Sequence, residues 1–410
     1  MTRLLRRMLR AFAAIAMLGC VALVALLAFL WLEHESEVTL PVPTGSFTVG
    51  RTIRDWTDPL DADSLAPVPG TKRELLVWIW YPSATGQSAV ADDYLPLELR
   101  PLPETADRAN IWTLLTRAPA NVRGHSARDP DVSREQRSYP VVIMRAGASA
   151  SVLNYSTLAE DLASHGYVVV GFDAPYRTGR VIFPDGRVMQ RAEQNNPERC
   201  VVPDRPQMEQ CAARILTAWT RDIAFVLDRL TRMNAADSSG RFTGRLDMTR
   251  VGVFGHSLGG AVAALFCHED SRCKAGIDID GAPHGSVVRE GLAQPFMFLL
   301  SDHGSETDSA SVQIERDIQS IYDRIPSDRR LRVSIRGAFH FMFSDDGALL
   351  KSGIVRGVLR ALGKLGIDAR RQLAVTTYCV HTFFDHFLKS PGTSALNIAS
   401  PRYPEIQVLE

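Results

Sequence analysis

The chain has 410 residues, 45% of them hydrophobic, and its 46 basic residues balance 46 acidic ones. A formal net charge of zero gives no reason to expect nucleic acid or a strongly charged substrate as a partner. The length is enough to bury a large core, in one big α/β domain or in two small ones.

The N-terminal segment predicts a membrane-spanning helix. Residues 11–32 carry no charge, follow four arginines within residues 3–10 and precede three glutamates within residues 33–37. A run of this length spans a bilayer, whereas the apolar part of a secretory signal is shorter and ends at small residues. Because the arginines lie on its N-terminal side, the positive-inside rule exports the rest of the chain. We predict an uncleaved anchor within residues 1–35, with the remainder facing the periplasm or the cell exterior.

Two other fates of this segment stay open. A cleaved signal would give a secreted protein, and it is the second interpretation. A lipoprotein site at Cys20 fits less well, because the apolar run continues well past the cysteine. All three interpretations place residues 36–410 outside the cytoplasm.

Cysteine spacing agrees with export. Cys200 and Cys211 bracket a polar loop, and Cys267 and Cys273 bracket a helix end, so disulfides could close both short loops in an oxidising compartment. Cys379 lies in an apolar C-terminal segment, where it is expected to pack as a small hydrophobe. Neither pair has the two-residue spacing of structural zinc sites, and no histidine cluster completes one, so we predict no metal.

Strands and helices alternate along most of the remaining chain. Residues 33–70 are acidic and contain prolines, which indicates a linker that leads into an irregular domain edge. Strands are predicted at 75–82, 140–145, 167–172, 250–254, 275–279, 295–300 and 331–335, with helices at 153–163, 208–233, 261–266 and 310–324. Alternation of this kind implies parallel pairing through right-handed crossovers. We therefore predict one α/β domain over residues 36–410, with helices on both faces of a mostly parallel sheet.

Residues 178–206 form an insertion between two of these elements. The stretch 181–189 is typical of a hairpin with a turn at Pro184-Asp185-Gly186. It leaves the C-terminal end of a central strand, the edge where open α/β sheets bind ligands. The insertion is either a wall of a substrate pocket or a surface hairpin fastened by Cys200 and Cys211.

The segment 250–266 carries the most specific pattern. An apolar run enters Gly255-His256-Ser257-Leu258-Gly259, and small residues with helical character follow. Such a strand, sharp turn and helix hold the serine in a strained conformation, and glycines flank it because a Cβ would collide with neighbouring backbone. Gly-x-Ser-x-Gly alone also occurs by chance as a glycine-rich turn. In its strand–turn–helix context, the pattern predicts that Ser257 is a nucleophile.

A serine nucleophile needs a general base, and the base is expected after a later strand. His340 follows the predicted strand 331–335 through a small turn, and we predict it as the base. His303, in the loop after the preceding strand, is the second candidate. The remaining histidines considered are expected to be surface or packing residues: His268, His381 and His386.

The base in turn needs a carboxylate that orients it. Asp280 ends the strand 275–279 and precedes the turn Gly281-Ala282-Pro283, and we predict it as the acid. Asp302, which ends the next strand, is the alternative. Asp278 lies on the same face as Asp280 and is expected to be a hydrogen-bonded structural carboxylate.

The oxyanion formed by attack of Ser257 requires preorganised N–H donors. One is predicted to be the backbone of Leu258, at the positive end of its helix. The other is predicted in the small-residue loop Gly147-Ala148-Ser149, whose backbone can approach closely.

With these residues in place, the chain resembles the plasma-type (isoform II) platelet-activating-factor acetylhydrolase family, close kin of the dienelactone-hydrolase-like α/β-hydrolases. The likeness covers most of residues 41–389. It rests on segments 43–50, 81–83, 155–156, 161–167, 255–260, 277–280, 337–345 and 383–389.

The resemblance implies the α/β-hydrolase fold, Ser257, Asp280 and His340 as the triad, and backbone donors at Ala148 and Leu258. Where the family typically has His-Gly, this chain has Ala146-Gly147; the donor is backbone, so the oxyanion hole is expected to survive. The resemblance also implies a calcium-independent esterase for short or oxidised acyl groups, such as platelet-activating-factor-like phospholipids, without a cofactor.

We therefore predict an exported, membrane-tethered serine esterase that works through an acyl-enzyme. Two other classes are compatible with the sequence. A lactonase, polyester depolymerase or peptidase would share the triad and differ in the pocket. A non-catalytic, membrane-tethered binding protein would be expected to have lost a triad member, and none is missing.

Overall fold

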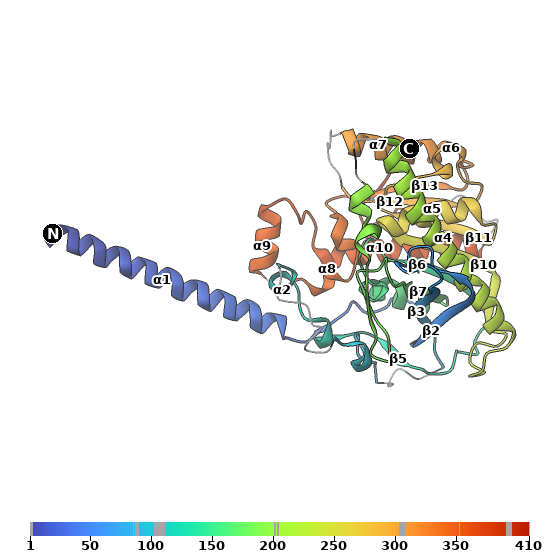
Figure 1. Ribbon diagram of the computed structural model, residues 1–410, viewed down its shortest axis with the longest axis horizontal. Helices are drawn as coiled ribbons and strands as arrows, with labels where there is room; N and C mark the ends of the chain where they lie inside the picture. Colours follow the sequence, from blue (N-terminus) through green and yellow to red (C-terminus); the bar gives the residue numbers. More distant parts are fainter. Residues whose placement is uncertain are drawn as a thin grey trace.

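A ten-stranded sheet forms the centre of the computed structural model (Figure 1). The structure describes the chain except residues 1–2, 85, 87–89, 102–110, 201, 203–204, 303–308, 352, 391–395 and 410. In spatial order the strands are β14 (Ile406–Val408), β13 (Arg330–Ile335), β12 (Phe296–Leu300), β11 (Cys273–Ile279), β10 (Leu246–His256), β6 (Tyr139–Arg145), β7 (Val168–Asp173), β3 (Lys72–Pro82), β2 (Val49–Ala62) and β5 (Ser126–Arg128).

The strands from β13 to β7 pair in parallel, and antiparallel strands flank them. β3 pairs antiparallel with both β7 and β2, and β14 pairs antiparallel with β13. This confirms the predicted mostly parallel sheet. Because the carboxyl ends of β10, β11 and β13 meet at one edge, the loops after these strands converge there.

Helices cover both faces of the sheet. Side chains alternate along β6, so that Val141 and Ile143 join one core and Val142 and Met144 join the other. The first core lies under α4 (Arg205–Ala235), α5 (Leu258–Glu269), α6 (Ser286–Glu290) and α7 (Ser309–Tyr322). The second lies under α3 (Ser156–Ser164), α8 (Asp346–Leu349) and α10 (Ala369–Phe384).

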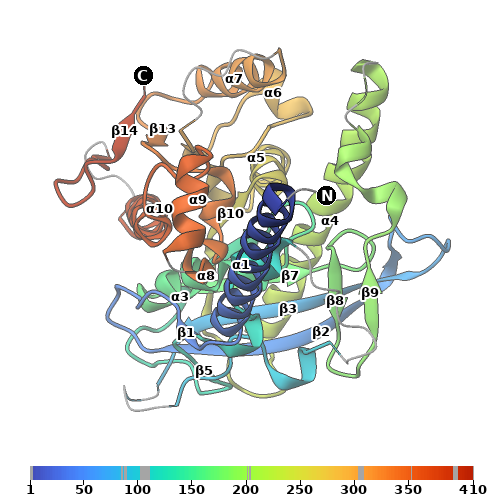
Figure 2. The ribbon, with the colours of Figure 1, turned by 90° about the vertical axis from the view of Figure 1, so that its left-hand side faces the viewer.

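Helix α1 (Arg3–His34) projects away from this domain (Figure 1). Its segment Arg6–His34 is long and apolar enough to cross a membrane, with a mean hydropathy of 2.8 over its most apolar 18 residues. Only its last turns pack on the domain, where Leu30 joins Val355 of α9 (Ile354–Ala361) and Leu350 in a small cluster; Figure 2 shows α1 passing in front of α9. A helix of this kind is either a membrane anchor or a signal sequence.

Smaller elements complete the fold. The short pair β1 (Val38–Thr39) and β4 (Val122–Arg123) and the short helix α2 (Ile111–Leu115) lie near the end of α1. The insertion contains the predicted hairpin, β8 (Arg180–Ile182) with β9 (Val188–Gln190). Both expected disulfides are present, Cys200–Cys211 and Cys267–Cys273, and Cys379 is buried.

The prediction for residues 33–70 was wrong in one respect: they contain β2, a strand of 14 residues. Its sequence is interrupted by charges, which made it unlike a strand. The charges are paired inside the fold: Arg51 bonds Asp92, and Asp58 bonds Arg73. Tertiary partners at these positions overrode the weak local pattern.

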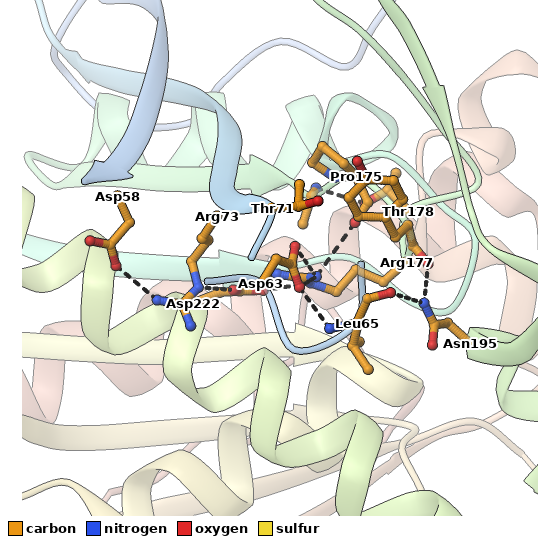
Figure 3. A network of polar contacts seen from close by, with 12 residues as sticks. Asp58, Asp63, Leu65, Thr71, Arg73, Pro175, Arg177, Thr178, Asn195 and Asp222 are labelled. Carbon is orange, nitrogen blue, oxygen red and sulfur yellow. Dashed lines mark hydrogen bonds and ion pairs between the residues drawn. The ribbon is translucent and has the colours of Figure 1, made fainter. Parts of the chain in front are cut away.

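A buried ion network joins helix α4 and the residues after β7 to the sheet (Figure 3). The guanidinium of Arg177, after β7, bonds both oxygens of Asp63 at 2.8 Å and both oxygens of Asp222 at 2.6 and 2.8 Å. Arg73 of β3 lies 3.2 Å from Asp222 and 2.9 Å from Asp58. Asp222 of α4 is fully buried and is shared by these two buried cations, which Asp63 and Asp58 also pair.

Replacement of Asp222 by alanine is expected to destabilise the fold strongly. The change leaves Arg177 and Arg73 without their shared carboxylate, and loss of one partner of a buried pair costs about 3–5 kcal/mol. Asp228→Ala is the matched control on the same helix, because Asp228 is 54% exposed and bonds Arg272 at the surface. Its expected cost is below about 1 kcal/mol. Urea unfolding measures both, and equal losses would show that the network does not stabilise the fold.

Candidate active site

Ser257 lies in a strained turn between β10 and α5. Its φ is 56° and its ψ −125°, a region that residues other than glycine rarely adopt. A Cβ on Gly255 would lie 2.2 Å from the carbonyl oxygen of Gly259, and a Cβ on Gly259 would lie 2.5 Å from those of Arg145 and Ala146. The two glycines are therefore required for β10, the loop after β6 and α5 to approach one another.

His340 and Asp280 meet at the carboxyl edge of the sheet. His340 follows β13, and its Nδ1 donates a hydrogen bond of 2.7 Å to Oδ2 of Asp280, which follows β11. Ser301 donates to the same carboxylate through its backbone N–H at 2.8 Å and its hydroxyl at 2.7 Å. With Nδ1 engaged, Nε2 is the ring nitrogen that remains to take a proton. Ser257 and His340 line the same two cavities.

The other two carboxylates have different partners. Asp302 accepts a 2.7 Å hydrogen bond from the backbone N–H of Gly337 and so fastens the turn that leads to His340. Asp278 is fully buried and accepts from the backbone N–H of Gly281 at 2.8 Å. Burial raises the pKa of Asp278 well above its usual value. Of the three aspartates, Asp280 is the one that contacts His340.

His284 lines one of the cavities that Ser257 and His340 share, and the other histidines considered lie elsewhere. His268 bonds the carbonyl oxygen of Gly291, His381 bonds Asp161, and His386 packs against Phe387. His303, the second candidate for the base, lies outside the described residues. His340 therefore combines a hydrogen bond to Asp280 with a place in the cavities at Ser257, whereas His268, His381 and His386 bond or pack elsewhere.

The two predicted oxyanion donors flank Ser257. Ala148 and Leu258 both line the larger cavity together with Ser257. The loop after β6 lies close, because a Cβ on Gly147 would be 3.3 Å from Cβ of Ser257. Leu258 begins the 12-residue helix α5, whose first N–H groups have no partner within the helix. This is the arrangement in which backbone donors stabilise an oxyanion.

Tyr155 contacts the loop after β6, and His256 packs beside His340. The sequence alone indicated a role for neither residue. The hydroxyl of Tyr155 accepts from the N–H of Gly147 at 3.3 Å and donates to Nδ1 of His256 at 2.8 Å. The His256 ring packs 4.5 Å from the His340 ring. Burial, together with His340, lowers the pKa of His256 to about 3, so its ring is neutral at pH 7. A tyrosine at a helix start has no local signal that would have identified it.

Two cavities meet at Ser257. The larger has a volume of about 820 Å³ and is mainly apolar, with Leu300, Ile314 and Ile318 in its walls. The smaller, of about 490 Å³, is more polar and is lined by Asn154, Ser344 and Asp346, among others. Ala148, Ser257 and His340 line both.

The insertion contributes to this region, as one of its two interpretations predicted. Pro197 and Glu198 line the larger cavity, and the Cys200–Cys211 disulfide fastens the segment that follows them. Gly179 packs against the loop Gly147-Ala148-Ser149 after β6, called the oxyanion loop below, because a Cβ there would lie 2.6 Å from the carbonyl oxygen of Ser149. The insertion is therefore both a fastened hairpin and a pocket wall.

Comparison with known proteins shows that this chain is similar to esterases. The family described as platelet-activating factor acetylhydrolase, isoform II, matches residues 32–178 and 224–390. A probable 1-alkyl-2-acetylglycerophosphocholine esterase from Arthroderma benhamiae is 25% identical over 397 residues, covering 92% of this chain and 95% of that protein. Platelet-activating factor acetylhydrolase from Bos taurus is 26% identical over 239 residues, covering 52% of this chain and 49% of that one.

A solved structure shows the same fold. The ferulic acid esterase from Streptomyces cinnamoneus superposes with a TM-score of 0.70 and 26% sequence identity, covering 92% of this chain and 100% of that chain. The range between the two matched family segments, 179–223, holds most of the insertion and the start of α4.

Proposed function

Because this chain belongs to the platelet-activating factor acetylhydrolase isoform II family, and is therefore a carboxylic ester hydrolase, we propose that it is a serine esterase in which Ser257, His340 and Asp280 form the catalytic triad. The main support for this proposal is the 2.7 Å contact between His340 and Asp280. Ser257 lines the same cavity as these two residues. Acyl transfer to serine needs a base held in one tautomer, and this contact supplies it.

The reaction proceeds in two halves. The hydroxyl of Ser257 attacks the ester carbonyl while Nε2 of His340 takes its proton, and the backbone N–H groups of Ala148 and Leu258 stabilise the oxyanion. His340 then gives the proton to the leaving alcohol, which leaves an acyl-enzyme. Water activated by the same nitrogen attacks the acyl carbonyl and releases the acid.

The substrate we propose is an ester with a short or oxidised acyl group on an amphipathic alcohol, such as a platelet-activating-factor-like phospholipid. The name of the fungal relative, 1-alkyl-2-acetylglycerophosphocholine esterase, supports this class. The two cavities support it as well, since the large one offers an apolar surface and the small one offers polar groups at the same serine. The ferulic acid esterase neighbour makes aromatic acyl esters the second candidate.

A panel of esters tests the substrate class. We expect the detergent-solubilised full chain to cleave p-nitrophenyl acetate, p-nitrophenyl butyrate and an sn-2 acetyl phospholipid faster than long-chain phosphatidylcholine, with the Ser257→Ala variant as the blank. Faster cleavage of a feruloyl ester would favour the second candidate. A lactonase, a polyester depolymerase or a peptidase would show its own preference in the same panel. Failure of a fluorophosphonate probe to label Ser257 would favour a non-catalytic binding protein.

We further propose that α1 anchors the enzyme, with residues 36–410 exported as one catalytic domain. The four arginines before the apolar segment support this orientation. Side chains of α9 beside the end of α1 are exposed and apolar, Ile354 and Val358 at 51% each, which suits a position against the membrane surface. N-terminal sequencing of the mature protein tests the anchor, because a new N-terminus beyond the apolar segment would mean a cleaved signal.

Tyr155 is proposed as a positioning residue for the oxyanion loop. Replacement by phenylalanine leaves the N–H of Gly147 and Nδ1 of His256 buried without their partner, which costs about 1–3 kcal/mol for each group if nothing else satisfies it. We expect kcat to fall about tenfold, equivalent to about 1.4 kcal/mol, with KM changed less than about twofold. The affinity for a trifluoromethyl ketone, whose adduct carries an oxyanion, should fall in parallel.

Tyr139→Phe is the control for this variant. Tyr139 is equally buried and donates to the carbonyl oxygen of Ser133 at 3.1 Å, but it begins β6, at the opposite end from the oxyanion loop. Loss of a hydroxyl there should lower the melting temperature and leave kcat unchanged. Equal losses of kcat in the two variants would show that Tyr155 acts only through general stability.

A further inference from the structure

A second cluster of ionisable side chains lies apart from Ser257, between α3 and α10. Asp161 lies on α3, His165 follows the end of α3 one helical turn later, and His381 of α10 faces both. Oδ2 of Asp161 is 2.9 Å from Nδ1 of His381 and 3.8 Å from Nε2 of His165. One ligand atom from each of the three residues lies within 4.8 Å of the others.

The chemistry of this set is that of a transition-metal site. Two imidazoles and one carboxylate suit Zn²⁺, Co²⁺ or Ni²⁺, whereas Ca²⁺ and Mg²⁺ prefer oxygen ligands only. Bonds of about 2.0–2.2 Å place the ligand atoms of a tetrahedral ion about 3.4 Å apart. The separations of 2.9 and 3.8 Å from Oδ2 of Asp161 lie on either side of that value.

Neighbouring groups orient the ligands. Oδ1 of Asp161 accepts from the backbone N–H of Thr44 at 2.8 Å and from its hydroxyl at 2.7 Å, which leaves Oδ2 facing the histidines. Nδ1 of His165 lies 3.8 Å from Oδ2 of Asp385, so a carboxylate stands behind the imidazole. Partners of this kind hold metal-binding carboxylates and histidines in position.

In the present arrangement the two imidazoles are stacked, with ring centres 4.0 Å apart and planes 21° from parallel. The lone pairs of stacked rings do not converge, so an ion requires His165 to turn about its side-chain bonds. His165 follows the end of α3, its side chain is 21% exposed, and its Nε2 lies within hydrogen-bond distance, 2.9 Å, of the hydroxyl of Thr44.

A cavity of about 400 Å³ opens beside the cluster. Its walls include Thr44, Asp161, His165, Tyr378, His381 and Arg402. This volume leaves room for a water molecule as a fourth ligand. Among the described residues, none lines both this cavity and the two cavities at Ser257.

We propose that Asp161, His165 and His381 bind one divalent transition-metal ion of the Zn²⁺ type, with water in the fourth position. The ion would tie α10 to α3 and to residues 41–44, and it takes no part in ester hydrolysis. Asp161 and His381 are far apart along the chain, so no spacing in the sequence indicated this metal site. Without a metal, His381 donates to Asp161 and His165 donates to Thr44, so the same residues hold the fold together.

Co²⁺ binding to the chelator-treated full chain, purified without a histidine tag, tests this site. We expect one equivalent of Co²⁺ to give the visible absorption of a tetrahedral ion and Zn²⁺ to displace it. Excess Zn²⁺ should raise the melting temperature by about 2–5 °C. Hydrolysis of p-nitrophenyl butyrate should be the same with and without the ion.

Two variants separate a metal site from a structural cluster. His165→Ala keeps the hydrogen bond between His381 and Asp161, so the metal-free protein should remain folded while Co²⁺ affinity falls at least about 100-fold. His386→Ala, on the turn after α10, removes a histidine that packs on Phe387 and should bind Co²⁺ as the unaltered chain does. No tetrahedral Co²⁺ spectrum in the unaltered chain, or equal affinity in His165→Ala, would overturn the proposal.

Discussion

Replacement of Ser257 by alanine is expected to lower kcat for p-nitrophenyl butyrate by about 10⁶-fold, because no other group at this turn can form the acyl-enzyme. The residual rate would come from the oxyanion donors and from binding alone. Alanine lacks only the hydroxyl, so the turn between β10 and α5 should keep its conformation. Initial rates, with the melting temperature as a check on folding, measure the effect.

Ser311→Ala is the matched control, because Ser311 of α7 also lines the larger cavity but is not at the nucleophile turn. We expect this variant to keep its activity within about twofold, since most surface substitutions change little. A fluorophosphonate probe should label the control and the unaltered chain, and it should not label Ser257→Ala. Full activity in Ser257→Ala would reject the proposed mechanism.

Replacement of Asp280 by asparagine is expected to lower kcat/KM by about 10⁴-fold, because the carboxylate holds His340 in the tautomer that leaves Nε2 free to take a proton. An amide in its place can donate to Nδ1 and stabilise the wrong tautomer. The variant should remain folded, since Ser301 can still donate to the amide oxygen. The pH dependence of kcat/KM should also change, because the imidazolium formed on His340 loses its counter-charge.

Asp302→Asn is the comparison that decides the acid. Asp302 bonds the N–H of Gly337, and an asparagine oxygen can accept the same bond, so we expect a loss below about tenfold. Steady-state kinetics on the two variants, under identical conditions, give the ratio directly. A larger loss from Asp302→Asn would assign the acid to the other strand end and refute the proposed role of Asp280.

Much of this architecture was predictable from local patterns. The strands β6, β7 and β10 are continuous apolar runs, and α4 and α7 follow the helical period, so their type and order could be read before any contact was known. The nucleophile turn was also local, because its glycines and serine are adjacent in sequence. Strand order predicted that His340 would meet an aspartate at this edge, Asp280 or Asp302, since loops at one edge of a parallel sheet must converge.

Other features could not be predicted, because they depend on residues that meet only after folding. β2 carries charges whose partners, Asp92 and Arg73, come from other parts of the chain. Tyr155 reaches His256 across 101 residues, and His381 reaches Asp161 across 220. No periodicity or spacing along the chain encodes such contacts.

By itself, then, the sequence determined the class of fold, the two cysteine pairs that form disulfides and the serine that we propose as the nucleophile, because each depends on neighbours within a few residues. Tertiary structure alone decided which aspartate contacts His340, how the insertion forms part of the wall at Ser257, and which buried charges neutralise one another. The physical reason is that burial, hydrogen bonding and the shape of a cavity are set by atoms brought together from distant segments. The choice of ester depends on the shape of the cavity. The side-chain clusters around Tyr155 and Asp161 also form only when distant segments come together.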